Sequence, residues 1–308
     1  FSPPGYSMIL VTVIVFLLLL GGFVWLDHLN KLMMAILAAA TLLAFSRSLP
    51  DPEALTGILV PRVPAGSILL VAAILGWMPT GIDVSVWHSF WTVEKMRAAG
   101  LATLKSPEER LDRLRNSLWD MRIGYLLSLG TGLMFVILGA VHLAGRGSEL
   151  QGVEFARELS TAYTTHLGAW MYHVFMLTAF FAMFSTSYTV IDGFSRSFSE
   201  CCSELVPALS APRTKRRTYV GFVGVSSIIA CLILACVRNP DILVKRAALV
   251  SLAVAPLLYA CNLVCVTRHI DETAMRPSRW SIALAVVGIL VMVFAIGLTV
   301  TLTVTSGH

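Results

Sequence analysis

Long apolar blocks recur along the whole chain, and they constrain its fold more than any other feature of the sequence. A helix needs roughly 20 mostly apolar residues to cross the hydrocarbon of a bilayer. The chain of 308 residues is 56% hydrophobic and only 13% charged, whereas a soluble domain usually carries about 25% charged residues. The core of a soluble domain could not accommodate so many blocks of this length. We therefore predict an all-α integral membrane protein.

The apolar blocks predict about eight transmembrane helices within a single transmembrane domain. The third block is too long for one straight crossing. The chain opens with Phe1-Ser2-Pro3-Pro4-Gly5, without Met or a charged leader, which predicts that it begins inside a larger protein. The domain covers residues 1–308, with predicted spans at residues 7–26, 29–45, 65–93, 123–144, 169–193, 219–236, 247–266 and 282–303.

Basic residues gather after the third and fifth predicted spans. Because Lys and Arg accumulate in cytoplasmic loops, we predict that both loops are cytoplasmic and that both chain ends lie outside. The net charge of +5 then requires no nucleic-acid partner. A bacterial inner membrane, lipid contacts and a monomer are expected. The residues are Lys95, Arg97, Lys105, Arg110, Arg113, Arg115 and Arg122 in the first loop, and Arg196, Arg213, Lys215, Arg216 and Arg217 in the second.

The loop after the third span also carries a helix-start pattern. Ser106 can cap a helix, Pro107 suits its first position, and Glu108 and Glu109 favour its positive end. Residues 106–116 therefore predict a short, solvated cytoplasmic helix that connects two spans.

The third span contains a signal for a break at its middle, where Pro79 and Gly81 stand two residues apart. Pro cannot donate a backbone N–H and clashes with the preceding turn, while Gly adds backbone freedom. Unpaired backbone at membrane depth survives only where it is buried in protein or lines a cavity. Broken helices of this kind bind substrates in secondary transporters. A simple proline kink is the structural alternative.

Two interpretations of Asp83 stay open. Thr80-Gly81-Ile82-Asp83 fits a capping box, in which Thr80 caps the second half-helix and Asp83 reaches back to its N–H groups. Asp83 is also the mid-span acid of this segment, and an intramembrane carboxylate is functional by default. It is therefore a candidate for binding an ion or carrying a proton. His88 is a second candidate for a proton relay, with an interfacial position as its favoured explanation.

The sequence resembles the Nramp family of secondary metal transporters, which have the inverted-repeat LeuT-type fold. The resemblance begins with the helical pair at residues 7–46 and includes Met78-Pro79, which is like the family's Met-Pro-His signature. It implies that the chain covers the family's helices four to eleven and that the first three, with their Asp-Pro-Gly segment, are missing. Further matching segments are Leu59-Val60-Pro61-Arg62-Val63-Pro64-Ala65-Gly66-Ser67 and Phe184-Ser185-Thr186-Ser187 with Gly193.

The resemblance implies specific metal ligands, namely the sulfur of Met78 and the backbone carbonyl of Leu75. A thioether is a soft ligand that favours Mn, Fe or similar ions over Mg or Ca. Thr80 stands where the family has its proton-linked His, and the family's tenth-helix Gln falls near Ala253. The site therefore offers fewer ligands than the family pattern to replace the water of a dehydrated ion. Transport of a hydrated cation such as Mg stays open as an alternative.

Hydroxyl residues in the fifth span are candidates for binding a coupling sodium ion, as this helix does in the LeuT fold. The alternative is that the hydroxyls bond back to their own helix. The candidates are Ser185, Thr186, Ser187 and Thr189.

We therefore predict a secondary active ion transporter that moves a divalent metal cation, with protons or sodium as the coupling ion, by alternating access. A transporter of a small anion is the first alternative, because free N–H groups at the start of the second half-helix would attract an anion. A channel or a non-transporting scaffold is the second. No hydrolytic or redox constellation is visible, so neither an enzymatic activity nor a cofactor is expected. The candidate substrate-binding residues are Leu75, Met78, Thr80, Gly81 and Asp83.

Overall fold

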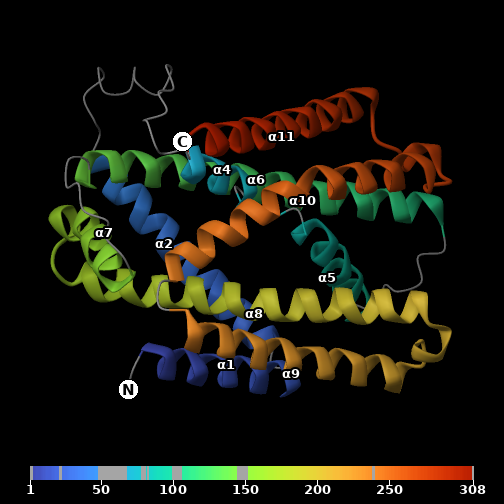
Figure 1. Cartoon of the computed structure of the whole chain (residues 1–308), viewed down its shortest axis with the longest axis horizontal. Coiled ribbons are helices and arrows are strands. Elements are labelled where there is room, and N and C mark those ends of the chain that lie inside the picture. Colours follow the sequence, from blue (N-terminus) through green and yellow to red (C-terminus); the bar gives the residue numbers. More distant parts are fainter. Residues whose placement is uncertain are drawn as a thin grey trace. The chain divides into compact units, whose positions relative to one another are not determined.

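The computed structural model describes most of the chain, and in this part every regular element is a helix (Figure 1). The prediction of an all-α protein is therefore confirmed for the described residues. The chain divides into two compact units, and the long helix α6, Pro107–Leu143, contributes to both. Unit 1 comprises Phe1–Pro61 and Leu126–Arg238, and unit 2 comprises Arg62–Tyr125 and Asn239–His308. The described residues are 3–20, 23–47, 68–77, 81, 83–98, 106–143, 152–237 and 240–306.

Five helices of the described part are long and apolar enough to cross a membrane. Many large apolar side chains on these helices are exposed, as a surface in contact with lipid requires, because lipid tails solvate apolar groups. The total of about eight transmembrane helices stays a prediction. The five helical segments are Pro107–His142, Met171–Leu205, Pro212–Cys236, Leu243–Arg268 and Arg279–Thr301, and a shorter apolar segment is found at Gly5–Leu20.

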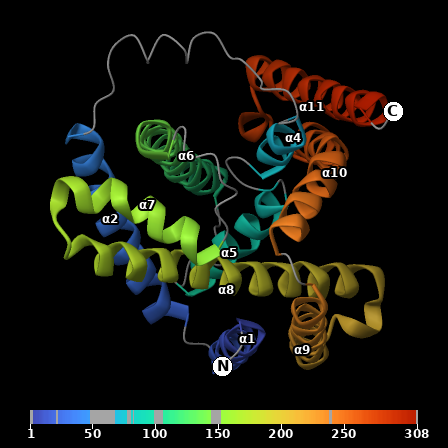
Figure 2. The ribbon, with the colours of Figure 1, turned by 60° about the vertical axis from the view of Figure 1, so that its left-hand side comes forward.

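In unit 1, helix α8 is central and has a different set of partners at each half (Figure 1, Figure 2). Its C-terminal half contributes Tyr188 to a core with Ile14 and Leu18 of α1 and Val223 of α9. Its N-terminal half packs against α2 and α7. The helices are α1 at Pro3–Leu20, α2 at Phe23–Arg47, α7 at Gly152–Leu167, α8 at Met171–Leu205 and α9 at Pro212–Cys236, with the 3₁₀ turn η1 at Pro207–Leu209.

The core at the N-terminal half of α8 contains a polar contact. Met171 and Phe175 of α8 pack with Leu138 of α6 and Tyr163 of α7. The hydroxyls of Tyr163 and Thr41 are both buried and lie 3.0 Å apart, within hydrogen-bond distance. Burial raises the pKa of the Tyr163 phenol, and the hydrogen bond with Thr41 opposes this shift. The buried phenol therefore stays protonated, and its hydrogen bond with Thr41 joins α2 to α7.

In unit 2, helix α4 packs against α10 and α11 (Figure 1, Figure 2). Gly76 permits this approach, because a Cβ at this position would collide with the carbonyl oxygen of Ala248 and lie 3.1 Å from the amide nitrogen of Leu252. Helix α5 is joined to α10 where Asn262 Nδ2 donates to Ser85 Oγ at 3.1 Å. The helices are α4 at Ile68–Trp77, α5 at Val84–Ala98, α10 at Pro240–Arg268 and α11 at Arg279–Ser306, with the 3₁₀ turn η2 at Thr273–Met275.

Helix α6 differs from its prediction. Ser106 caps it as expected, since its Oγ accepts the Glu109 backbone N–H at 3.1 Å. However, the helix does not end near residue 116, and one continuous helix joins the predicted cytoplasmic helix to the fourth predicted span. After Pro107 there is no Gly or Pro before Gly124 to interrupt it. The prediction of a separate connector helix is therefore wrong, because hydropathy locates only the membrane-embedded part of a helix.

Changing Gly76 to Ala should destabilise the protein, because the added methyl group would meet backbone atoms of α10 that cannot rotate away. Overpacking of this kind typically costs about 1–3 kcal/mol, which a thermal melt of the purified protein in detergent would detect. Gly288→Ala in α11 is the matched control, because nothing lies within 4 Å of its added Cβ. Equal melting temperatures for the two variants would contradict the close approach of α4 to α10.

Candidate functional site

Two helices flank the segment in which the sequence predicts a break. Helix α4 ends at Trp77 and α5 begins at Val84. Between them, the structure describes Gly81 and Asp83. The predicted ligands Met78 and Thr80 lie outside the described residues, as does Pro79, so their roles stay predictions.

Leu75 lies in the last turn of α4, where its side chain is exposed. The group of Leu75 that is predicted to bind the metal is its backbone carbonyl. The last four carbonyls of a helix have no partner within that helix, so this position is suited to donating an oxygen to an ion.

Asp83 lies directly before α5, and its side chain folds back over Gly81. The Asp83 Oδ1 atom occupies the space that a Cβ on Gly81 would need, so a side chain at position 81 would displace the Asp83 carboxylate. Ser251 Oγ, from α10, lies 3.8 Å from the same point. Both Asp83 and Ser251 are partly buried. A carboxylate and a hydroxyl from separate elements of unit 2 therefore come together beside the break.

The first backbone N–H groups of α5 already have partners. Val84 N–H donates to the carbonyl of Gly81 at 3.1 Å. The N–H groups of Val86 and Trp87 both donate to the carbonyl of Asp83, at 3.0 and 3.3 Å. Asp83 thus caps the helix through its backbone, and its carboxylate is the group that lies over Gly81.

Helix α10 of the same unit is continuous but lacks one of its backbone hydrogen bonds. Pro256 lies inside α10 and cannot donate the N–H that would normally reach the Leu252 carbonyl. Leu252 is buried, and its amide faces the position of Gly76 on α4. Ala253, where the family resemblance places a polar residue, has an exposed side chain, whereas its neighbour Ser251 supplies a hydroxyl near Gly81. Ser251 was not identified as a site residue from the sequence. The signal that could have drawn attention to this part of the helix is Pro256, a proline within an apolar span.

The predicted proton-relay candidate His88 has its polar contacts within α5. Its Nδ1 lies 3.4 Å from Thr92 Oγ1, and the Thr92 hydroxyl donates to the His88 carbonyl at 2.8 Å. Next to it, Trp87 is buried and packs edge-on against Trp91, with ring centroids 6.2 Å apart. The relay role of His88 stays a prediction.

The hydroxyl cluster of α8 bonds to its own helix. Each hydroxyl proton goes to a carbonyl three or four residues earlier, as the alternative interpretation of the sequence expected. The oxygens keep lone pairs that can still accept or coordinate, so sodium binding stays a prediction. The contacts are Ser185 to Ala182 at 3.1 Å, Thr186 to Ala182 at 2.8 Å, Ser187 to Met183 at 3.0 Å and Thr189 to Thr186 at 2.9 Å.

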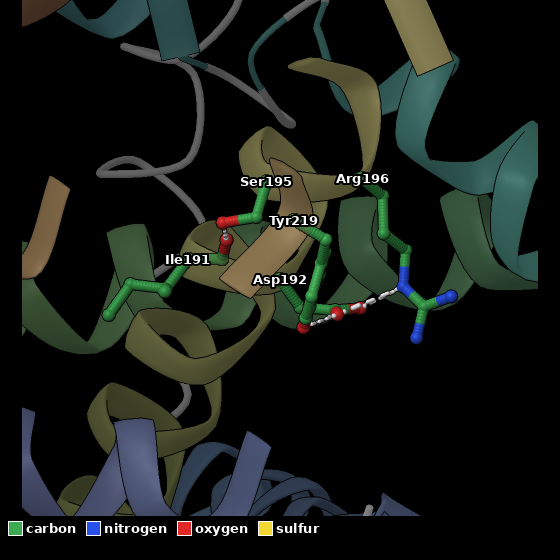
Figure 3. A network of polar contacts seen from close by, with 5 residues as sticks. All are labelled: Ile191, Asp192, Ser195, Arg196 and Tyr219. Carbon is green, nitrogen blue, oxygen red and sulfur yellow. Dashed lines mark hydrogen bonds and ion pairs between the residues drawn. The ribbon is translucent and has the colours of Figure 1, made fainter. Parts of the chain in front are cut away.

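A buried polar network between α8 and α9 was not predicted (Figure 3). Asp192 is only 2% exposed. Its two carboxylate oxygens accept Arg196 Nε at 2.9 and 2.8 Å, and Oδ1 also accepts the Tyr219 hydroxyl of α9 at 2.7 Å. The acid and the base are four residues apart on α8, a spacing that brings side chains together on a helix. This four-residue spacing is the sequence signal from which the ion pair could have been predicted.

The network also corrects the predicted position of Arg196. The fifth span was expected to end at residue 193, with Arg196 in the following loop, but α8 continues to Leu205. Arg196 therefore lies inside the helix, where its guanidinium carbon is 5.8 Å from the centre of the Tyr219 ring. Ser195, beside it, donates to the Ile191 carbonyl at 2.6 Å (Figure 3). The apolar stretch marks only part of the helix, and the polar residues that follow it do not end the helix before Leu205.

The long apolar helices define the class of this chain as an integral, multi-pass membrane protein. The family model for natural resistance-associated macrophage protein-like (Nramp) proteins matches residues 2–305, nearly the whole chain. The chain belongs to the Nramp family, which confirms the resemblance seen in the sequence. Members of this family are secondary metal-ion transporters and not enzymes, as the sequence predicted for this class of protein.

An uncharacterized protein of Pasteurella multocida is similar to this chain. The two are 29% identical over 202 residues, which make up 63% of this chain and 44% of the relative. The match therefore covers less than half of the length of that protein.

Removing the Tyr219 hydroxyl should loosen the contact between α8 and α9. Tyr219→Phe deletes one hydrogen bond to the buried Asp192 carboxylate, and a bond to a charged group is typically worth about 1.5–3 kcal/mol. We expect a lower melting temperature of the purified protein. Tyr172→Phe, which removes a hydroxyl from another position of α8, is the matched control. A melting temperature no lower than that of the control would show that the network does not stabilise the helix pair.

Proposed function

We propose that this protein is a secondary active transporter that moves a divalent metal cation by alternating access, with its substrate site at the break between α4 and α5. The observation that carries the proposal is the position of the Asp83 carboxylate over Gly81, with the Ser251 hydroxyl beside it. Oxygen ligands of this type replace part of the hydration shell of a metal ion. The family of the chain supports the same class of substrate.

The hydrogen bonds at the start of α5 favour a cation over the alternative of a small anion. An anion site at a helix start depends on free N–H groups. Three of these groups, on Val84, Val86 and Trp87, donate to carbonyls of Gly81 and Asp83 instead. A small anion would also meet the negative charge of the Asp83 carboxylate.

The residues around the break leave Mn, Fe and Mg as candidate substrates. Carboxylate and hydroxyl oxygens are hard ligands that suit Mg and Mn, whereas the Met78 sulfur would favour Mn or Fe. Thr80 replaces the His of the family signature by a hydroxyl and adds a further hard ligand. The carbonyl of Leu75 would complete the contribution of α4.

Protons or sodium would drive the transport. Asp83 is the candidate for carrying the proton, with His88 as a relay, and the oxygens of Ser185 and Thr189 are among those that could hold sodium. We further propose the LeuT-type fold, a location in the bacterial inner membrane, cytoplasmic loops after the third and fifth predicted spans, and a monomer.

Asp83→Asn tests the proposed site directly. The full-length protein in liposomes would be assayed for uptake of Mn, Mg and a small anion, each with a proton or a sodium gradient. We expect uptake of a divalent cation by the unmodified protein, and for Asp83→Asn a loss of its pH dependence together with weaker uptake, because the variant cannot carry a proton or a full charge. Asp271→Asn, an exposed acid of the same unit, is the matched control. Uptake of the anion alone would overturn the cation proposal.

Met78→Ala tests whether sulfur is a ligand. Loss of a soft ligand should lower uptake of Mn and Cd relative to Mg, because soft ligands stabilise these ions selectively. The measurement is competition between the ions in the same liposome assay. Unchanged relative uptake would remove Met78 from the site while leaving the role of Asp83 intact.

A further inference from the structure

The first turns of α9 carry basic side chains of two different kinds. Lys215 faces α8, where its Nζ lies 2.6 Å from Glu200 Oε2 and its carbonyl accepts the Ser199 hydroxyl at 2.9 Å. Arg213, Arg216 and Arg217 are exposed. Within the described part of the chain, no carboxylate forms an ion pair with any of these three arginines. Their charges are therefore available to a partner outside the chain.

The three arginines share one face of α9 and form a pocket. Residues three and four positions apart are neighbours on a helix surface, and this spacing places Val220 and Gly221 one turn beyond Arg216 and Arg217. Together these residues line a shallow pocket of about 510 Å³. Its rim is thus cationic at the start of the helix and apolar one turn further on.

The apolar side of the pocket continues along the membrane-spanning part of α9. Neither Gly221 nor Gly224 has a heavy atom within 4 Å of the position of a Cβ, so the surface above both is open. The side chains of Val225 and Ile228 on this helix are exposed by 57% and 62%. Because α9 is long and apolar enough to cross the bilayer, this surface meets lipid tails.

We propose that this pocket binds the headgroup of an anionic phospholipid. Guanidinium groups match the geometry of a phosphate with paired hydrogen bonds, and basic pockets on the cytoplasmic side of membrane proteins recognise acidic headgroups. The glycerol and the first carbons of the acyl chains lie over Val220 and Gly221. A free phosphate ion would use the arginines but not the apolar side, so the continuous change from charge to hydrocarbon favours a lipid.

The contacts between α8 and α9 hold this face in position. Tyr219 donates to the buried Asp192, and Lys215 pairs with Glu200, so both bonds fix the rotation of α9 against α8. Positions 215 and 219 share one side of the helix, and the exposed arginines lie on another. The contacts with α8 therefore leave the arginine face of α9 turned away from α8 and open to a lipid.

Native mass spectrometry of the full-length protein with added phosphatidylglycerol or phosphatidylcholine tests the proposal. The unmodified protein should bind phosphatidylglycerol more tightly. The triple variant Arg213→Gln, Arg216→Gln and Arg217→Gln should weaken this binding by about fivefold for each arginine, which corresponds to the roughly 1 kcal/mol that a basic side chain contributes at an anionic membrane surface. Gly221→Leu should also weaken binding, because it fills the pocket while keeping all three charges.

The matched control removes the same charge from α6, as Arg113→Gln, Arg115→Gln and Arg122→Gln, and should bind as the unmodified protein does. Equal weakening in this control would show that only general surface charge matters. Equal affinity for both lipids, or complete displacement of phosphatidylglycerol by millimolar inorganic phosphate, would overturn the lipid site. If the arginine variant fails to fold, Gly221→Leu decides the outcome, because its side chain enters open space.

Discussion

A helix that is interrupted inside a membrane must still satisfy its backbone N–H and C=O groups within the protein, because lipid offers no hydrogen bonds. The start of α5 meets this requirement through the carbonyls of Gly81 and Asp83, which accept the N–H groups of Val84, Val86 and Trp87. This bonding bears on the two interpretations of Asp83. The backbone carbonyl of Asp83 accepts two of these N–H groups, while its carboxylate lies over Gly81, on the side where Ser251 approaches. The capping box with Thr80 and the ion-binding role both stay predictions.

The same unit places a second weakened backbone next to the first. Helix α4 can approach α10 only because Gly76 has no side chain, and the contact falls at Ala248 and Leu252. Four residues after Leu252, Pro256 removes a hydrogen bond of α10. The end of α4 and the Pro256 region of α10 thus lie in the same unit, and both contain backbone carbonyls that lack a partner within their own helix.

The sequence predicted the class of the chain, its family and the helix start at Ser106, because these depend on local composition and on short motifs. It did not predict that α6 continues unbroken from Pro107 to Leu143, since hydropathy reports on the solvent around a helix and not on its length. It also did not predict the contact of Ser251 with the Gly81 region. That contact joins positions far apart in the chain, and no local pattern encodes such a pairing.

The prediction of cytoplasmic loops counts every Lys and Arg equally. The structure distinguishes those that pair with a carboxylate of the protein from those that do not. Arg196 lies 2.8 Å from the buried Asp192, and Lys215 lies 2.6 Å from Glu200, where α8 and α9 pack together. Burying a charge without a partner is costly, so a base that faces another helix needs an acid there. A base that faces the membrane surface needs none from the protein, because lipid phosphates can neutralise it. For the arginines of α9, which have no carboxylate partner in the described part of the chain, an external anion would therefore lower the free energy.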